Sequence, residues 1–230
     1  MNIILTPAIP GGYQYRQSPN KNLDELTYLN RLTDDIILRL RESVKDTPFI
    51  TITKLAGPMD QILSRLHQQT QTTPSSSNQI IAVGLNSTRM DGNYHTNSGW
   101  KVISNPESSQ SSALATTLAT AAIQILGPRV AATAPQPNAI RYLNQTPILN
   151  IPNIPTVLTL NLYQDNRQDA TYLLSSTGRQ AIIDLHVKGI LTYLINLSPA
   201  DCPARHPSSS SHNPMHHRTG SADSQNSTPQ

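Results

Sequence analysis

The residues of this chain that could do chemistry are its seven histidines, its 14 acidic side chains and its one cysteine. A catalytic zinc centre needs three protein ligands, commonly histidines with a carboxylate, and leaves one position for water. His67 and His186 lie in predicted helices, and His95 lies in a predicted loop. The other four stand in a polar C-terminal stretch that we interpret as a solvated tail rather than a metal site: His206, His212, His216 and His217.

Signals for other kinds of catalysis are missing from the sequence. Cys202 falls in the same C-terminal stretch, where an unpaired thiol is a simpler interpretation than a nucleophile. No serine stands in a Gly-x-Ser-x-Gly elbow, and no predicted strand leads into a Gly-x-Gly-x-x-Gly or Walker loop. The adjacent Gly11 and Gly12 are interpreted as a turn.

Composition and charge argue against two classes of protein. Charged residues make up 13% of the chain, against roughly a quarter in typical domains, and the formal net charge is only +3. The arginines are scattered rather than clustered, so we expect no nucleic-acid partner. No run approaches ~18 consecutive apolar residues, and the N-terminus lacks the pattern of a secretory signal peptide. We therefore expect no membrane association, and a location in the cytoplasm or outside the cell after release by lysis.

Short apolar runs alternate along the chain with helical patterns. In residues 24–44, apolar side chains recur at steps of three and four and so share one helical face. Further helices are predicted at 59–69 and 112–126, from Asp165, and at 178–197; strands are predicted at 2–6, 49–53, 79–83, 100–103, 147–149 and 156–160. This alternation is typical of an α/β fold with a mainly parallel, twisted sheet of about six strands and helices on both faces.

The predicted domain organisation is one folded unit followed by a tail. Residues 1–198 are long enough for one sizeable core, and 70–78 read as a surface linker rich in Thr, Ser and Pro within it. From 199 to 230 the chain has too few apolar residues to offset the entropy of ordering, so we predict a disordered tail.

One segment is more specific than these general patterns. Pro155-Thr-Val-Leu-Thr-Leu160, together with the helical stretch 172–190, resembles the last catalytic strand and closing helix of zinc-dependent N-acetylmuramoyl-L-alanine amidases. Weaker similarity runs in the same order through Tyr28-Leu-Asn-Arg31, 60–65 and the strand that follows Gly99. The resemblance implies an amidase-like fold. It also implies a link to bacterial peptidoglycan, in which these enzymes cut the amide bond between glycan and stem peptide.

The resemblance also implies a chemical site from which this chain departs. The family holds zinc with two histidines and a carboxylate, and a glutamate moves the proton of the zinc-bound water. Here Ile9, Leu26 and Gly84 stand at the three ligand positions, and Leu160 stands at the position of the glutamate. Since none of these side chains can bind a metal or carry a proton, we expect no catalytic residue, no metal and no other cofactor.

We therefore predict an amidase-like domain that is catalytically inactive and binds peptidoglycan fragments (muropeptides) or a protein partner. The candidate groove-binding residues are Asn86, His95 and Asn161.

Two alternatives stay open. One is an active zinc-dependent peptidoglycan amidase, a cell-wall hydrolase or endolysin, whose displaced site uses Glu25, His95 and Asp91. The other is a structural or assembly protein without a ligand, which suits the low charge and the spacer-like tail.

Overall fold

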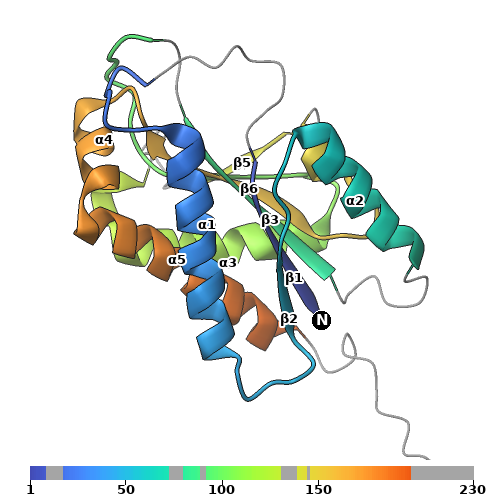
Figure 1. The fold of residues 1–230 in the computed structure, drawn as a ribbon. Helices are drawn as coiled ribbons and strands as arrows, with labels where there is room; N and C mark the ends of the chain where they lie inside the picture. Colours follow the sequence, from blue (N-terminus) through green and yellow to red (C-terminus); the bar gives the residue numbers. More distant parts are fainter. Residues whose placement is uncertain (9–17, 73–79, 89–91, 131–138, 144–145, 198–230) are drawn as a thin grey trace, which may run out of the picture.

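The computed structural model describes residues 1–8, 18–72, 80–88, 92–130, 139–143 and 146–197 (Figure 1). Ile9, Asp91, most of the predicted linker and the predicted tail lie outside these residues. The prediction of a disordered tail therefore stays a prediction. Residues 70–72, the start of the expected linker, are the last residues of a helix.

In the part of the chain that the structure describes, six strands form one sheet, in the order β2-β1-β3-β6-β4-β5. Every neighbouring pair is parallel except β4 and β6, which are antiparallel. This confirms the predicted α/β class and the mainly parallel sheet. The strands are β1 (Asn2–Pro7), β2 (Thr51–Lys54), β3 (Ile80–Thr88), β4 (Lys101–Ser104), β5 (Ile140–Tyr142) and β6 (Thr156–Tyr163).

Two details of the predicted strands are wrong. The apolar run 147–149 belongs to a 3-10 helix, η3 (Pro147–Asn150), which begins at a proline whose fixed φ suits a helical first turn. The fifth strand is instead β5, a polar three-residue strand at the edge of the sheet. An edge strand needs no apolar pattern, because one of its sides meets solvent.

Among the described residues, five α-helices cover the sheet, and side chains cap most of their amino ends. Asp24 Oδ1 accepts a hydrogen bond from the backbone of Thr27 at 2.7 Å, and Ser108, Asn166 and Ser175 cap three other helices in the same way. The helices are α1 (Glu25–Ser43), α2 (Met59–Thr72), α3 (Ser109–Leu126), α4 (Arg167–Leu174) and α5 (Ser176–Asn196). Among the described residues, none of these helices is long and apolar enough to cross a membrane.

The alternation of side chains along the strands divides the interior into two cores. In β3, Ile81 and Val83 face a large core that α1, α3 and α5 cover, whereas Ile80 and Ala82 face a smaller core beneath α2. In Figure 1, α1 and α5 lie to the left of the strands and α2 to the right. We call these two sides of the sheet the α1 face and the α2 face.

Two glycines permit close packing on the α1 face. A Cβ atom at Gly189 of α5 would lie 2.8 Å from the Cα of Leu118 in α3, so the glycine lets the two helices approach. A Cβ atom at Gly178 would overlap the backbone carbonyl of Tyr172 and lie 2.9 Å from its ring. The turn between α4 and α5 therefore has no room for a side chain at position 178.

An irregularity interrupts β6 near its end. The pairing of β3 with β6 shifts between Asn86 and Thr88, and Leu162 has a φ of 65°. A bulky residue in this left-handed region is unusual and carries backbone strain. Because of the shift, Asn161 and Leu162 are both fully buried, and Tyr163 returns to a partly exposed position.

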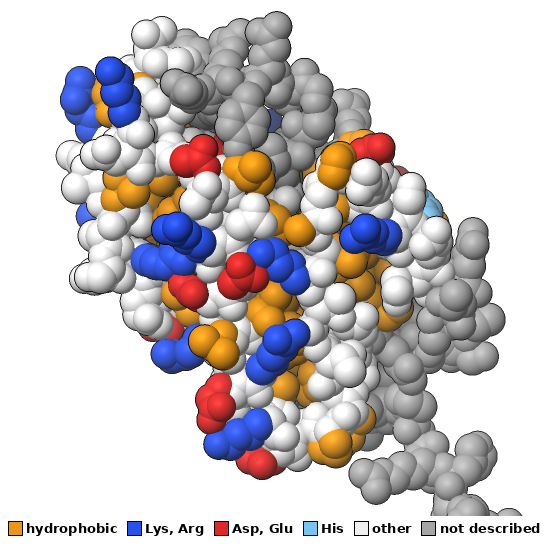
Figure 2. All heavy atoms as spheres, in the orientation of Figure 1, with side chains coloured by type: hydrophobic (Ala, Val, Ile, Leu, Met, Phe, Trp, Pro, Cys, Tyr) orange, Lys and Arg blue, Asp and Glu red, His pale blue; other side chains and the backbone are white. Residues whose placement is uncertain are grey.

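The outer surface over α1 is mixed in charge. Figure 2 shows basic and acidic side chains interspersed there. Several of them form ion pairs, such as Arg179 with Asp35 at 2.6 Å and Lys54 with Asp34 at 2.8 Å. These exposed pairs contribute little to stability, but they leave no large surface of a single sign on this side.

Candidate functional site

Leu160, predicted to stand at the position of the amidase glutamate, lies in a row of three side chains at the carboxyl edge of the parallel strands. Leu160 of β6 is in register with Asn86 of β3 on one side and with Lys101 of β4 on the other. Register partners project from the same face of a sheet, and Leu160 packs partly against the smaller core, so all three belong to the α2 face. We call Asn86, Leu160 and Lys101 the edge row. Ligands of open α/β sheets commonly bind at this edge.

Lys101 and Tyr163 form a contact beside Leu160. The Nζ of Lys101 lies 3.5 Å from the hydroxyl oxygen of Tyr163 and 5.8 Å from the centre of its ring. Both side chains are half-buried. The ion pairs among the described residues use Arg39, Lys45, Lys54 and Arg179, and none of them includes Lys101.

Gly84, the position of an implied histidine ligand, faces a closed apolar environment. A Cβ atom there would lie 2.9 Å from Leu158 Cδ1 and 3.0 Å from the Cβ of Ala8, with Ile148 Cδ1 at 3.6 Å. An imidazole would require these apolar groups to move. The packing around Gly84 therefore leaves little room for a side chain at this position.

The ligand position assigned to α1 is turned outward. Leu26 is 43% exposed, whereas the neighbouring Glu25 is 8% exposed and accepts a hydrogen bond from Ser87 Oγ at 2.9 Å. Ser87 Oγ in turn accepts a hydrogen bond from Gln164 Nε2 at 2.7 Å. Ser87 follows Asn86 in β3, so this cluster lies toward α1, on the opposite side of the sheet from Leu160. The helical pattern did not predict that Glu25, rather than Leu26, faces the sheet.

Asn161 lies on the opposite face from Leu160. It is fully buried; its Nδ2 donates to the carbonyl of Asn86 at 3.0 Å and to Thr159 Oγ1 at 3.2 Å, and its Oδ1 accepts from Trp100 Nε1 at 2.9 Å. A role in binding stays a prediction that would require these bonds to break. Asn86 is 8% exposed, and its Oδ1 accepts from the backbone of Ser87 at 2.8 Å.

His95 lies in the loop that packs on the connection between β6 and α4. It is half-buried, and its backbone N–H donates to the carbonyl of Asp165 at 2.6 Å. Its carbonyl accepts from Asn166 Nδ2 at 3.3 Å. The guanidinium carbon of Arg167 lies over the ring of the preceding residue, Tyr94, at 4.0 Å from the centre of that ring. The loop is thus attached to the carboxyl edge, where a groove-binding role was predicted.

His186 belongs to the interior of the α1 face. It is fully buried; its Nδ1 donates to the carbonyl of Ile182 at 2.7 Å, and its Nε2 lies 3.0 Å from Thr159 Oγ1. Burial lowers the pKa of His186 to about 4, because the interior disfavours the charged form. Trp100, Asn161, Thr159 and His186 thus form one connected set, the core hydrogen-bond chain.

No group of three or more His, Cys, Asp and Glu side chains that could hold a metal occurs among the described residues. Of the four altered positions, Gly84 and Leu160 share the α2 face, Leu26 points to solvent, and Ile9 lies outside the described residues. The displaced zinc site needs Asp91, which also lies outside them. Leu26 therefore does not face the side of the sheet that Gly84 and Leu160 share, and the displaced zinc site stays a prediction.

Lys101, Tyr163, Ser87 and Gln164 are the residues at this edge that sequence reasoning missed. Each is one or a few positions from a residue singled out in the sequence. Their proximity comes from the pairing of β3, β6 and β4, and the sequence pattern carries no signal for that register.

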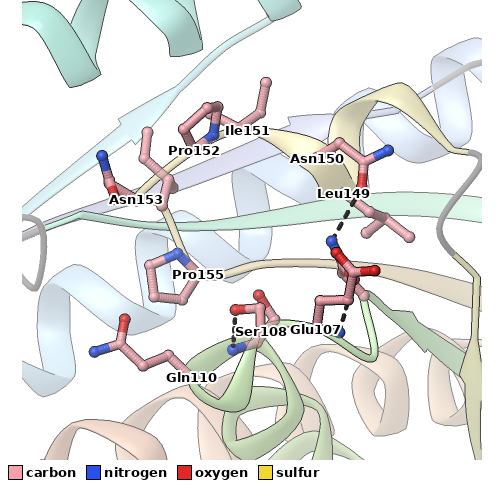
Figure 3. A pocket seen from close by; sticks show the side chains of 12 residues that line it. Glu107, Ser108, Gln110, Leu149, Asn150, Ile151, Pro152, Asn153 and Pro155 are labelled. Atoms are coloured by element: carbon pink, nitrogen blue, oxygen red, sulfur yellow. Dashed lines mark hydrogen bonds between the residues drawn. The ribbon is translucent and has the colours of Figure 1, made fainter.

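A hollow lies beside the amino end of β6 (Figure 3). It has a volume of about 500 Å³ and is lined by the start of α3 and the segment before β6, including Glu107, Asn150 and Asn153. Asn105 Nδ2 donates to Asn150 Oδ1 at 3.0 Å across it. The twelve lining residues include one carboxylate and no cation.

Comparison with known proteins identifies the fold. No family model and no curated protein matches the sequence. Among solved structures, an N-acetylmuramoyl-L-alanine amidase from Clostridium difficile 630 is similar with a TM-score of 0.63, 15% identity, and coverage of 86% of this chain and 98% of that one. The amidase Ami1 from Mycobacterium smegmatis is similar with a TM-score of 0.61, 18% identity, and coverage of 84% and 96%.

A third similar structure includes a partner protein. The CwlD amidase from Clostridioides difficile, in complex with the GerS lipoprotein, has a TM-score of 0.58, 17% identity, and coverage of 84% of this chain and 98% of that one. At these identities the likeness establishes the fold. The chain described here therefore has the fold of N-acetylmuramoyl-L-alanine amidases over nearly their whole length.

Proposed function

We propose that this chain is an amidase-like domain that binds peptidoglycan fragments at the carboxyl edge of its sheet without hydrolysing them. The observation that carries the proposal is the edge row, in which Leu160 stands between Asn86 and Lys101. An aliphatic side chain there cannot take a proton from water. The closed apolar surroundings of Gly84 support the same conclusion for a metal ligand.

The fold supports peptidoglycan as the ligand class, because the similar solved structures are N-acetylmuramoyl-L-alanine amidases by name. The active alternative draws less support. Its Glu25 is engaged by Ser87 toward α1, on the other side of the sheet from Leu160. A carboxylate held there is poorly placed to act over the edge row.

A protein partner is the second candidate. The complex of the CwlD amidase with a lipoprotein supports it, since a domain of this fold can take part in such an assembly. For this chain the protein partner would bind to surface away from the carboxyl edge of the sheet.

Two measurements test the proposed function. The purified protein, incubated with zinc and purified sacculi, should release no soluble muropeptides, and a titration with a fluorescent muropeptide should saturate. Release of muropeptides would overturn the inactive assignment. A flat titration with no release would favour a protein partner or a purely structural role.

A further inference from the structure

The charge of Lys101 is poorly compensated within the part of the protein that the structure describes. The residue is half-buried, and the hydroxyl of Tyr163 at 3.5 Å is the one hydrogen-bond neighbour of its ammonium group among those residues. Partial removal of an ammonium group from water is unfavourable unless an anion or several acceptors replace the water. A ligand that carries a negative charge would supply what the fold leaves out.

The carboxylate of Asp169, which lies close to the backbone of Tyr163, is occupied by backbone donors. Asp169 is 2% exposed, and its Oδ2 accepts hydrogen bonds from the backbone of Gly99 at 2.9 Å and of Tyr163 at 3.1 Å. The Asp169 carboxylate therefore joins α4 to Gly99, just before β4, and to Tyr163 at the end of β6. Arg167, the first residue of α4, is exposed and stacks on Tyr94.

The neighbours of Lys101 define the chemistry of the ligand. The Tyr163 hydroxyl, which accepts from Lys101, still has its own proton to donate. Two adjacent donors, one of them charged, suit the two oxygens of a carboxylate. Leu160 lies next to Lys101 in the edge row and offers an apolar surface beside this anion site.

We propose that Lys101 and Tyr163 bind the free carboxylate of a peptide, while Leu160 contacts the apolar side chain next to it. The inference deepens the proposed function and rests on it for the source of the peptide, the stem of a muropeptide. Leu160 then has a role in binding at the position where the amidases have their glutamate. The altered position would have exchanged proton transfer for contact with the ligand.

The test compares two ligands and matched variants by isothermal titration. The ligands are a soluble muropeptide with free carboxylates and the same muropeptide with its carboxylates amidated. Lys101→Gln should weaken binding of the free acid by roughly tenfold to a hundredfold, the range for a hydrogen bond to a charged group. It should leave the weak binding of the amidated form unchanged. Lys188→Gln, which removes one exposed charge from α5, is the control and should bind as the parent does.

Two further variants keep the proposal open to contradiction if Lys101→Gln fails to fold. Lys101→Arg retains the charge and should retain most of the affinity, and Tyr163→Phe removes only the hydroxyl and should weaken binding several-fold. Thermal unfolding of each variant checks that its fold is intact. Equal affinity of the parent for the acid and the amidated form would overturn the proposal.

A separate probe distinguishes this failure from failure of the proposed function. N-acetyl-alanyl-alanine carries the carboxylate and a small apolar side chain but no glycan. If it binds in a Lys101-dependent manner and the muropeptide does not bind, the carboxylate site stands and the peptidoglycan assignment falls. If the muropeptide binds equally to the parent and Lys101→Gln, the peptidoglycan assignment stands and the carboxylate site falls. Binding of neither probe would overturn both.

Discussion

The two faces of the sheet differ in how their polar groups are compensated. On the α1 face, Trp100, Asn161, Thr159 and His186 hydrogen-bond to one another and to backbone carbonyls in the interior. On the α2 face, the edge row ends in a half-buried lysine with one long hydrogen bond. The first arrangement fixes a fold, because each member would be costly to leave unpaired. The arrangement on the α2 face leaves Lys101 able to form further hydrogen bonds with a ligand.

This difference separates the residues that hold the fold together from those of the edge row. The α1 face contains the close approach of α3 and α5 and most of the core. The altered Leu160 lies instead at the margin of the smaller core. A substitution there changes chemistry at little cost to the fold, so the two faces can change independently.

The largest expected effect is on the α1 face, at the turn between α4 and α5. Gly178→Ala should destabilise the protein by more than about 3 kcal/mol, because the new methyl group overlaps the carbonyl of Tyr172. Urea unfolding measures the change. Gly92→Ala is the control, since a Cβ atom there has nothing within 4 Å, and it should be within about 0.5 kcal/mol of the parent. Equal stability of the two variants would show that this turn is not closely packed.

The second effect is a pH dependence from the core hydrogen-bond chain. The pKa of His186 is about 4 in the folded protein, below the value of about 6.5 in the unfolded chain, so the unfolded state takes up the proton first. The stabilisation is complete above pH 6.5. It should fall by about 1.4 kcal/mol for each pH unit as the pH drops toward 4, and then level off.

Urea unfolding of the parent and of His186→Gln across this range isolates the contribution of His186. The difference in unfolding free energy between the two proteins should narrow as the pH falls. A constant difference would mean that the imidazole is not kept neutral by burial.

The third effect tests a single bond of the same chain. Trp100→Phe removes the N–H that Asn161 Oδ1 accepts and should cost about 1–3 kcal/mol for the unpaired acceptor, in addition to the lost volume. Tyr142→Phe, at a position that is 50% exposed in β5, should be nearly neutral. If both changes are neutral in thermal unfolding, the chain does not hold the α1 face together.

The smallest effect on stability is expected on the α2 face. Leu160→Glu should change the unfolding free energy by less than about 1 kcal/mol, because the side chain lies at the margin of the core and gains Lys101 as a neighbour. Leu158→Glu, two residues earlier on the same face and 6% exposed, should be severely destabilising. The pair therefore maps where the core ends.

The same Leu160→Glu variant also tests hydrolysis and muropeptide binding at the α2 face. It should not release muropeptides from sacculi with zinc, because restoring one group does not rebuild a metal site. It should weaken binding of the acidic muropeptide, since the new carboxylate neutralises Lys101. Hydrolysis by this variant would mean that ligands outside the described residues still hold zinc.

Much of the fold could be predicted from the sequence, because its signals are local. Half of the residues of β1 and of β6 are Ile, Leu or Val, and α1 shows a clear helical period, so each was predicted within a few residues. The two errors, at 147–149 and at β5, are short segments. There, three apolar residues are ambiguous and an edge strand needs no pattern.

The site was harder to predict because it depends on how elements are oriented and paired. The rotation of α1 decides that Glu25 faces β3 and Leu26 faces solvent, and that rotation is set by packing along the whole helix. Likewise, Lys101 meets Leu160 only through the antiparallel register of β4 and β6. A resemblance can indicate which positions have changed, but it does not show which new neighbours those positions have acquired.

The irregularity at Leu162 acts as a β-bulge, in which β6 has one residue more than the β3 segment that it pairs with. Before it, odd and even positions alternate between the two faces; after it, the order is inverted, so Tyr163 joins the side of Leu160. Any numbering transferred from a regular strand would therefore be out of phase from this residue onward. Straightening the strand with all its residues kept would turn Tyr163 into the interior and separate it from Lys101, whereas deletion of Leu162 would leave the tyrosine on the side of Leu160.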